Sequence, residues 1–365
     1  MRIGIPREIK PLEGRIALSP DACQLLTESG HQLVVEHDAG VLSGYADDQY
    51  IAAGATIGAD AQATYGESGL IVKVKEPVAG DLQHLNRNHL LFCYLHLAPN
   101  PVLTQELQEK GLTAVGFETV ETGAGELPLL APMSDIAGRL ATQVATTLLH
   151  QPEGGKGLLL GGIPGADPGQ VVIIGAGNAG GNAAALAAAI GARVVVFDVR
   201  SERLSAMSAL GDNVSALHPD PDILAKEIAS ADVLIGAALR TGEKAPHIVT
   251  RSMVRQMQAG SVVVDISVDQ GGCIETTRPT TWEDPTYVEE GVLHFCVTNM
   301  PGAVPRSATQ ALSAILLPYV EAMCEPDWRS RPELLKGINI EAGDIIHPAL
   351  REYLDGRGGQ TSQRG

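Results

Sequence analysis

One segment of this 365-residue chain limits its fold more than any other: residues 171–198, VVIIGAGNAGGNAAALAAAIGARVVVFD. An apolar strand is followed by a glycine-rich turn, an Ala-rich helix and a second apolar strand. Gly175, Gly177 and Gly180 have the spacing GxGxxG. In that spacing the first glycine permits a tight turn, the second lets backbone N–H groups approach a pyrophosphate, and the third lets the helix pack closely on the sheet. The segment predicts a βαβ unit that binds a dinucleotide at the helix N-terminus.

The end of the second strand bears on the choice of nucleotide. Asp198 can accept hydrogen bonds from ribose hydroxyls and would repel a 2′-phosphate, which favours NAD over NADP. Arg200 and Arg203 leave this choice open, because either could neutralise a 2′-phosphate. We interpret Arg200 as a solvated charge at the start of a helix and Arg203 as a flank of the adenosine.

The rest of the chain repeats the alternation of short apolar runs and amphipathic segments. At about one domain per ~150 residues, the length fits two domains, and 44% apolar with 19% charged residues excludes dominant disorder. The pattern predicts an α/β protein with two doubly wound, Rossmann-like parallel sheets. The predicted strands are 2–5, 32–35, 70–74, 89–94, 113–117, 171–174, 193–197, 232–236, 261–266 and 293–297.

Longer elements connect the two halves. Helices are predicted to start near Pro20, Asp47 and Asn100, and the helical spacing of apolar residues predicts a long helix over 134–150. The Gly- and Pro-rich stretch 151–170 predicts a loop or hairpin that leads into the second domain. A final helix over 306–323 is expected to return the chain to the first domain.

Charge and cysteine content narrow the partners and the compartment. The chain has 26 basic and 43 acidic residues, a formal net charge of −17, which disfavours nucleic acid and anionic membranes as partners. Its five cysteines include no CxxC pair, which indicates reduced thiols in a cytoplasmic protein and no zinc site. The N-terminus has no apolar signal-peptide core, and no apolar run reaches the ~18 residues of a membrane span.

Three side chains in the first half follow predicted strands. Arg15 lies after the first strand, Lys75 ends LIVKVK, and His96 follows HLLFCYL. Each alone has a structural interpretation: a surface arginine, a solvated lysine and a capped histidine. Ligands of open parallel sheets bind at the carboxyl ends of the strands, however, so the three together favour a shared site. Arg15 can bind a carboxylate, Lys75 can stabilise charge on a carbonyl oxygen, and His96 can move protons near neutral pH.

Two strand ends in the second half carry further candidates. Asp269 follows the strand SVVVDI, at the expected nicotinamide end of a bound dinucleotide, although a loop aspartate that caps the next turn has the same pattern. Asp265, earlier in that strand, is interpreted as structural. Asn299 and Met300 follow the strand ending at Val297, where an amide could hold the nicotinamide carboxamide or ribose.

The chain resembles the alanine dehydrogenase/pyridine nucleotide transhydrogenase family over residues 1–323. The resemblance rests on ordered motifs: GIPREIKPLEGRIALSP, VKVKEP, YLHLA, LPLLAPMSDIAGR, GGKGLLLGGIPG, VVIIGAGNAGGNAA, DISVDQGG, RPTTWEDPTY and VTNMPGAVPRSAT. It implies a cleft between two domains, a substrate domain of residues 1–130 and 305–365, and an NAD-binding domain of residues 131–304. It also implies a homohexamer.

The same resemblance implies residue roles. Arg15 and Lys75 would bind the substrate, His96 and Asp269 would be the acid–base pair, and Tyr94 and Met133 would wall a small pocket. The implied contacts to NAD, in addition to the glycine turn, are Ser134, Asn178, Ala179, Asp198, Arg203, Leu239, Arg278, Asn299 and Met300.

The implied activity is NAD-dependent reversible oxidative deamination of L-alanine to pyruvate and ammonium, a reaction of amino-acid catabolism, with no metal. Three alternatives stay open. The chain could condense a 2-oxo acid reductively with a larger amine, as opine-forming enzymes do. It could exchange hydride between nucleotides, as the transhydrogenase branch does, although that reaction needs no Arg–Lys–His set. It could also be a non-catalytic NAD-binding module.

Overall fold

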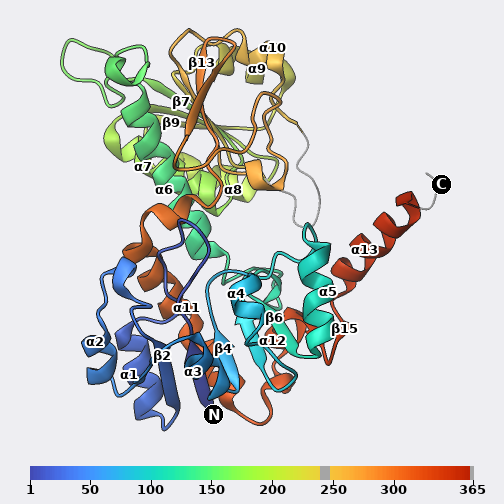
Figure 1. The fold of residues 1–365 in the computed structure, drawn as a ribbon. Coiled ribbons are helices and arrows are strands. Elements are labelled where there is room, and N and C mark those ends of the chain that lie inside the picture. The colour runs from blue at the N-terminus through green and yellow to red at the C-terminus, as the bar shows by residue number, and fades with distance from the viewer. Residues whose placement is uncertain (239–246, 362–365) are drawn as a thin grey trace. The chain divides into compact units, whose positions relative to one another are not determined.

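The computed structural model describes residues 1–238 and 247–361, and these form two compact units (Figure 1). The first unit comprises Met1–Met133 and Gly302–Gly365, and the second comprises Ser134–Pro301. Each unit has one mostly parallel sheet, with helices on both faces. This confirms the predicted α/β class with two doubly wound sheets.

The first unit contains an eight-stranded sheet with the order β15-β14-β6-β5-β4-β1-β2-β3. Strands β1 to β6 are parallel, whereas β14 and β15 are antiparallel additions at the edge. The strands are β1 (Arg2–Ile5), β2 (Gln32–Glu36), β3 (Thr56–Gly58), β4 (Leu70–Val72), β5 (Leu90–Cys93), β6 (Thr113–Gly116), β14 (Ile338–Glu341) and β15 (Asp344–Ile345). The helices are α1 (Pro20–Glu28), α2 (Asp47–Ala52), α3 (Ala61–Gly66), α4 (Ala79–Leu82), α5 (Pro101–Lys110), α11 (Pro305–Cys324), α12 (Pro332–Gly337) and α13 (Pro348–Thr361).

The second unit contains a seven-stranded sheet with the order β12-β13-β11-β10-β7-β8-β9, in which only the edge strand β12 is antiparallel. Its strands are β7 (Gln170–Ile174), β8 (Arg193–Phe197), β9 (Val214–Leu217), β10 (Val233–Gly236), β11 (Val262–Asp265), β12 (Thr286–Glu289) and β13 (Val292–Phe295). Its helices are α6 (Ala131–Leu148), which begins just before the division between the units, α7 (Asn178–Ile190), α8 (Ser201–Ser208), α9 (Pro221–Ala229) and α10 (Arg251–Val254).

Both sheets have the same internal order. Read from the edge, the parallel strands run third, second, first, fourth, fifth and sixth along the chain, which is the doubly wound order. The order reverses between β1 and β4 in the first unit and between β7 and β10 in the second. Ligands of such sheets bind outside the carboxyl ends of the strands at this reversal. Each unit therefore has one edge at which a site is expected.

Local sequence explains where the elements start and stop. Ser19 caps α1 by accepting a hydrogen bond from the N–H of Ala22 at 3.4 Å, and Pro20 opens the helix. Strands such as β4, β5 and β11 are buried along their whole length because helices cover both faces. Helix α7 packs against β7, β8 and β10, and its alanines allow this close approach.

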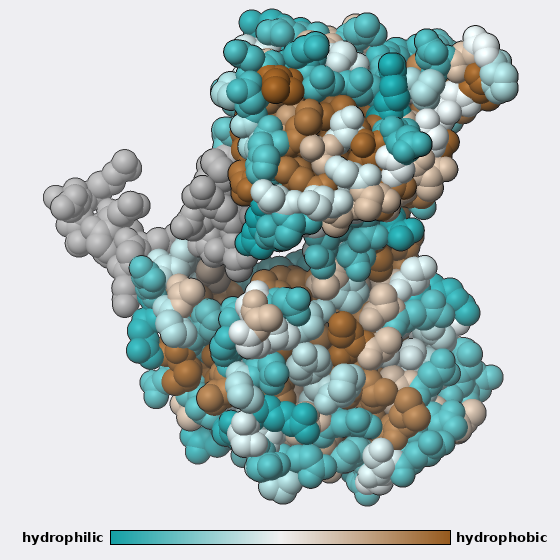
Figure 2. All heavy atoms as spheres, turned by 180° about the vertical axis from the view of Figure 1, so that it is seen from behind, coloured by the Kyte–Doolittle hydropathy of each residue, from teal (hydrophilic) through white to brown (hydrophobic). Residues whose placement is uncertain are grey.

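The outer surface is mixed in character. Hydrophilic side chains are spread over the face shown in Figure 2, with hydrophobic residues exposed between them. Leu42 and Val199, at 71% and 75% exposure, are among the most exposed large hydrophobic side chains. Within the described residues, no helix combines the length and apolarity needed to cross a bilayer.

The C-terminal region differs from expectation. The polar composition after Glu325 predicts a tail without a sheet strand, yet β14 pairs with β6 and extends the first sheet. Ile338 and Ile340 are buried there, and Ile340 belongs to the same hydrophobic core as Leu91 and Leu107. The apolar alternation of β14 spans only INIE, which is too short to stand out from a polar tail.

Shortening a buried side chain of β14 should show that this strand contributes to the hydrophobic core. We expect Ile340→Ala to lower the free energy of unfolding by about 2–5 kcal/mol, because Ile340 is fully buried. The control Ile346→Ala, at a position 40% exposed, should cost under about 1 kcal/mol. Urea unfolding monitored by circular dichroism measures both. Equal small losses would mean that β14 does not contribute to the core.

Candidate functional site

The first unit brings three predicted residues to one edge of its sheet. Arg15 lies in the loop after β1, Lys75 follows β4, and His96 follows β5. Since β1, β4 and β5 are parallel neighbours, their carboxyl ends meet at this edge. The reversal of strand order falls between the first two of these strands, so the predicted substrate residues lie where the topology places a ligand.

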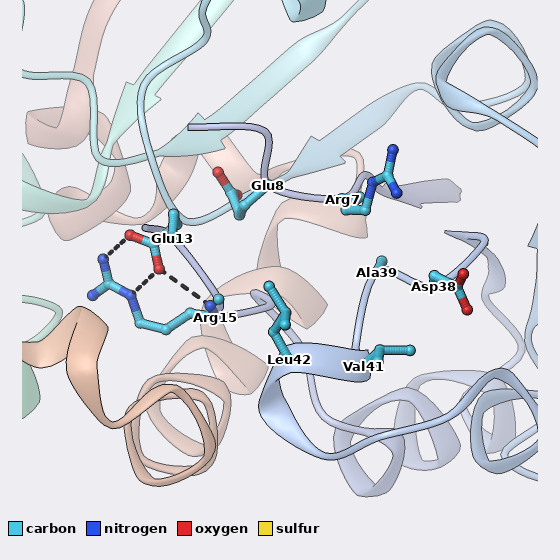
Figure 3. Close-up of a pocket in the computed structure, with 9 residues that line it drawn as sticks. Arg7, Glu8, Glu13, Arg15, Asp38, Ala39, Val41 and Leu42 are labelled. Carbon is cyan, nitrogen blue, oxygen red and sulfur yellow. Dashed lines mark hydrogen bonds and ion pairs between the residues drawn. The ribbon is translucent and has the colours of Figure 1, made fainter. Parts of the chain in front are cut away.

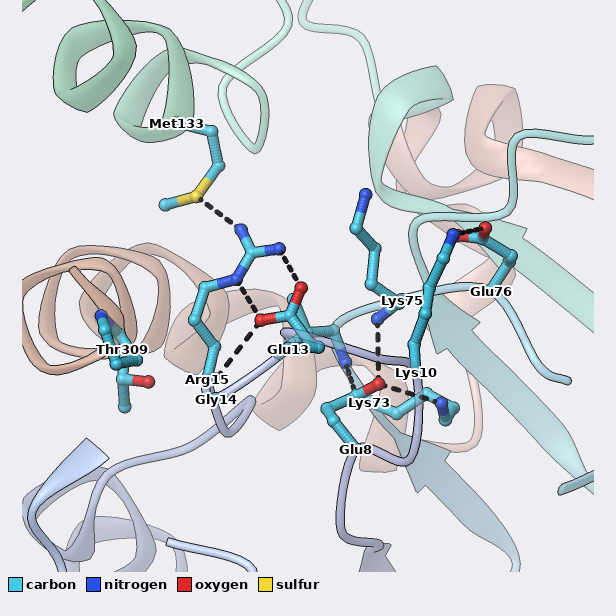
Figure 4. A network of polar contacts seen from close by, with 12 residues as sticks. Glu8, Lys10, Glu13, Gly14, Arg15, Lys73, Lys75, Glu76, Met133 and Thr309 are labelled. Atoms are coloured by element: carbon cyan, nitrogen blue, oxygen red, sulfur yellow. Dashed lines mark hydrogen bonds and ion pairs between the residues drawn. The ribbon is translucent and has the colours of Figure 1, made fainter. Parts of the chain in front are cut away.

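Arg15 is held by a neighbour on its own loop. Glu13 accepts from Arg15 Nε at 2.6 Å and from Nη2 at 2.5 Å, and both side chains are almost fully buried (Figure 4). Nη1 faces the sulfur of Met133 at 3.1 Å. Burial alone would lower the pKa of Arg15, but the hydrogen bonds and charge of Glu13 outweigh it and raise the pKa. The guanidinium therefore stays charged and has one fixed orientation.

A second carboxylate, Glu8, anchors the end of β4. Glu8 accepts from the N–H of Val74 at 2.6 Å and of Lys75 at 3.4 Å, and from Lys73 Nζ at 3.0 Å. Lys73 Nζ also lies 3.3 Å from Asp81. The Lys73 side chain is 1% exposed, and its buried ion pair with Glu8 was not predicted from the sequence. The signal was present, because a lysine inside the apolar run LIVKV must find a carboxylate if the strand is buried.

Lys75 has a different environment from Lys73. Its side chain extends past Glu13, and its ammonium group is directed away from the Glu8–Lys73 pair (Figure 4). Partial burial, and secondarily the positive charge of Arg15, lower the pKa of Lys75 below its ordinary value of 10.5. On its other side, Lys10 forms an ion pair with Glu76. An anion that binds beside Lys75 would stabilise the charged form of its ammonium group.

His96 has an unusual backbone conformation. Its φ is +47°, a left-handed value that is uncommon outside glycine and often found at functional sites. Glu118 stabilises this turn by accepting from the N–H of Leu95 at 3.0 Å and of His96 at 2.7 Å. The imidazole is exposed and stacks on Tyr94, with the ring centroids 6.0 Å apart. Tyr94 OH donates to the carbonyl of Leu129 at 2.6 Å, so Tyr94 presents its ring rather than its hydroxyl to His96.

A pocket in the first unit is lined by Arg15 and by both carboxylates of its loop. Its volume is about 210 Å³, and Figure 3 shows the carboxylates of Glu8 and Glu13 on one side and Val41 and Leu42 on the other. Arg15 also lines it, whereas Lys75 and His96 do not. The sequence did not predict this pocket, because its wall combines the loop after β1 with residues 38–42.

The second unit forms the predicted glycine turn between β7 and α7. Gly175 has φ +98°, and a Cβ there would lie 2.8 Å from the carbonyl oxygen of Ala237. A Cβ at Gly180 would overlap the carbonyl oxygen of Gly175. At Gly177 the nearest atom to such a Cβ is Arg203 Nη1 at 3.6 Å, an ordinary contact. The fold therefore requires the first and third glycines but not the second, whose small size suits close approach of a ligand to the N-terminus of α7.

Asp198 ties the glycine turn to the next strand. Its carboxylate accepts from the N–H of Ala176 at 2.7 Å and of Arg200 at 2.9 Å, and Arg203 Nη1 lies 3.5 Å away. The side chain is buried, with 8% of the residue exposed. Asp198 thus has a structural role that the sequence did not indicate, beside the predicted role toward ribose.

Asp269 lies in a short 3-10 turn after β11, Val268–Gln270, and is exposed. The turn is held by Asp265, which accepts from Ser267 Oγ at 2.7 Å, Thr277 Oγ1 at 2.7 Å and the N–H of Cys273 at 3.1 Å. Burial raises the pKa of Asp265, and the hydrogen bonds from Ser267 offset part of that rise. These contacts agree with a structural role for Asp265.

The other predicted nucleotide contacts occupy varied positions. Asn299 has φ +57° and Met300, which is buried, begins a 3-10 turn. Arg278 stacks over the ring of Tyr287 at 4.0 Å, which orients its guanidinium. Ser134 lies in the first turns of α6, and Asn178 and Ala179 open α7. Leu239 lies outside the described residues.

One surface cluster has the residue types of a metal site. His37, Asp38 and Asp47 place their ligand atoms within 4.8 Å of one another, in the part of the chain that the structure describes. They also bond among themselves: His37 Nδ1 lies 2.6 Å from Asp47 Oδ2, which raises the pKa of His37. We assign this exposed cluster no metal.

Comparisons of sequence and structure identify the family of this chain. Residues 4–137 match the N-terminal domain of the alanine dehydrogenase/PNT family, and residues 141–348 match its C-terminal domain. The chain is 46% identical to an alanine dehydrogenase of Bacillus subtilis, over 97% of this chain and 95% of that one. A solved structure named L-alanine dehydrogenase superposes with a TM-score of 0.94 at 45% identity, covering 98% and 99% of the two chains.

A transhydrogenase from Sinorhizobium meliloti is more distant, with a TM-score of 0.83 and 27% identity over 96% of this chain and 100% of that one. Since both family domains match in order and full-length relatives exceed 40% identity, the chain belongs to the alanine dehydrogenase/PNT family.

Proposed function

We propose that this protein is an amino-acid dehydrogenase that catalyses the reversible oxidative deamination of L-alanine to pyruvate and ammonium with NAD. The observation that carries the proposal is the meeting of Arg15, Lys75 and His96 at the carboxyl edge of the first sheet. The full-length relatives named alanine dehydrogenase support the same reaction. We assign residues 1–130 and 305–365 to substrate binding and residues 131–304 to nucleotide binding.

Several features of the second unit support a dinucleotide-binding site. Space at Gly177 and the N–H groups that open α7 suit a pyrophosphate, and Asp198 suits the adenosine ribose. We favour NAD because the carboxylate of Asp198, beside the glycine turn, would repel the 2′-phosphate of NADP. Arg203 lies next to this carboxylate. We propose further contacts from Ser134, Asn178, Ala179, Leu239, Arg278, Asn299 and Met300.

In this proposal, different side chains of the protein perform different parts of the reaction. When bound, the nicotinamide supplies hydride acceptance from the alpha carbon of the substrate. Arg15 orients the substrate carboxylate, and Lys75 stabilises negative charge on the carboxylate and on the carbonyl oxygen of the 2-oxo acid. Deamination passes through an imine that adds water, and His96 and Asp269 move the protons of that step. Tyr94 and Met133 limit the space around the substrate.

The family resemblance also supports a homohexamer and a cytoplasmic location. Light scattering on the purified protein measures the assembly. We propose no nucleic-acid or membrane partner.

The activity itself is tested by absorbance of NADH with L-alanine, NAD and alkaline buffer. We expect NADH to accumulate, and in the reverse direction pyruvate with ammonium should react faster than pyruvate with ornithine or lysine. His96→Ala should lower turnover by about 10²–10⁴-fold while NADH still binds, because proton transfer contributes about that much. The control His150→Ala, at an exposed position, should react normally. A flat trace for the wild type would favour a non-catalytic module.

The nucleotide site is tested by a pair of glycine substitutions. Gly177→Ala should fold normally, because its Cβ meets only ordinary contacts, but should weaken NADH binding by about tenfold or more. Gly180→Ala should instead lower stability by more than about 1–3 kcal/mol, because its Cβ overlaps backbone. Fluorescence titration with NADH and thermal unfolding separate the two effects. Wild-type affinity in Gly177→Ala would count against a nucleotide at this turn.

The lowered pKa of Lys75 predicts a pH dependence of anion binding. A lysine whose pKa is lowered loses its charge at a lower pH than an ordinary lysine, so affinity for a carboxylate should fall as pH rises while still below 10.5. Oxamate, an unreactive analogue of pyruvate, can be titrated with NADH present from about pH 7 to 10. Lys75→Arg should remove this decline, because arginine stays charged. An equal decline in both proteins would exclude Lys75 as its cause.

A further inference from the structure

We propose that Tyr287 is a positioning residue for the nucleotide, because its ring holds the guanidinium of Arg278 in place at the carboxyl edge of the second sheet. The inference rests on the proposed function, which gives Arg278 a contact to NAD, and it adds a residue to that site. Tyr287 acts through Arg278 rather than by touching the nucleotide.

Arg278 lies close to the turn that carries Asp269. The residue before it, Thr277, donates from Oγ1 to Asp265 at 2.7 Å, and Asp265 is the last residue of β11. Asp265 also accepts from Ser267 Oγ at 2.7 Å, directly before the Asp269 turn. One buried carboxylate therefore ties both segments to the carboxyl end of β11, the edge at which ligands of such sheets bind.

Tyr287, on β12, contacts Arg278 through both its ring and its hydroxyl. The guanidinium carbon lies 4.0 Å from the ring centroid, well within the range of a cation–π contact. The phenol oxygen accepts from the backbone N–H of Arg278 at 2.9 Å and donates to the carbonyl of Thr276 at 3.0 Å. One side chain thus fixes Arg278 at two points, the backbone through the hydroxyl and the guanidinium through the ring.

Tyr287 is itself held by the neighbouring strand β13. Tyr287 and His294 lie opposite each other in the antiparallel pair, and their rings stack with centroids 5.0 Å apart. His294 is fully buried, and its Nδ1 faces the carbonyl of Val292 at 3.0 Å, which assigns the proton to this nitrogen. Its Nε2 then accepts from Thr276 Oγ1 at 2.8 Å. Burial lowers the pKa of His294, so a neutral ring supports Tyr287 and does not repel Arg278.

This support matters because Arg278 is exposed. An exposed arginine side chain loses rotamer freedom when it binds a ligand, and that loss weakens binding. The ring of Tyr287 removes part of this freedom before the nucleotide arrives. A ring stacked on the face of the guanidinium uses none of its N–H donors, which point outward in the plane and suit a phosphate or a ribose hydroxyl.

Titration of the full-length protein with NADH, followed by NADH fluorescence, tests the proposal. We expect Arg278→Ala to raise the Kd by about tenfold or more, as loss of a charge-assisted hydrogen bond does. Tyr287→Leu should raise it by about two- to fivefold, the range of an exposed cation–π contact. Tyr287→Phe keeps the ring and should stay near the wild-type Kd. The control Val288→Ala alters the next residue of β12, which is 65% exposed and faces the other way, and should bind normally.

The double variant Arg278→Ala/Tyr287→Leu shows whether Tyr287 acts through Arg278. We expect it to bind NADH as weakly as Arg278→Ala alone, because the guanidinium that the ring supports is already gone. A further loss in the double variant, or an equal loss in Tyr287→Phe and Tyr287→Leu, would overturn the proposal, because the ring would then not act on Arg278.

The remaining outcomes also decide the question. Wild-type affinity in Tyr287→Leu or in Arg278→Ala would overturn the proposal. Thermal unfolding shows that folded proteins are compared, and if Tyr287→Leu does not fold, Tyr287→Ile, which suits a strand, takes its place. A wild type that binds no NADH would instead contradict the proposed function.

Discussion

The carboxyl edge of the first sheet depends on the buried carboxylate of Glu8. Glu8 belongs to the loop after β1 and reaches the end of β4, where it binds Lys73 and the backbone N–H groups of Val74 and Lys75. Burial raises the pKa of Glu8, and the charge of Lys73 opposes that rise. Because removal of one partner of a buried ion pair costs about 3–5 kcal/mol, the pair strongly fixes the register between loop and strand. The backbone of Lys75 is held by this connection, whereas Arg15 is held by Glu13.

The loop after β1 contains two buried carboxylates with different partners. Residues 6–19 supply Glu8, which holds backbone, and Glu13, which holds a cationic side chain. Each carboxylate removes freedom from a group proposed to meet the substrate. Such preorganisation is what makes oriented charges effective in a site from which water is excluded. In the second unit Asp198 and Asp265 act in a comparable way: Asp198 closes the glycine turn proposed to bind the nucleotide, and Asp265 closes the turn that carries Asp269. Buried acids that brace turns are therefore a recurring device of this chain.

Most parallel strands could be predicted because they are continuous apolar runs bounded by turn residues. The prediction that strands begin at Arg2, Gln32, Leu70, Thr113 and Arg193 is confirmed. The strands β3, β9, β12, β14 and the two-residue β15 were not predicted. They are two to four residues long, and β12, β14 and β15 pair antiparallel, so they rely on pairing with a neighbour rather than on their own pattern. Lys73 was missed for a related reason: its burial becomes evident only when Glu8 and Asp81 lie beside it.

The sequence by itself determined the doubly wound class, the glycine turn and the positions of Arg15, Lys75, His96 and Asp269 after strands. These features are local, since they follow from hydrophobic period, turn chemistry and spacing along the chain. Only the tertiary structure decided which carboxylate pairs with which cation, because Glu13 pairs with Arg15 and Glu8 pairs with Lys73. It also decided that Gly180 serves packing and Gly177 does not. Pairing and close approach depend on distances between segments remote in sequence, which no local pattern encodes.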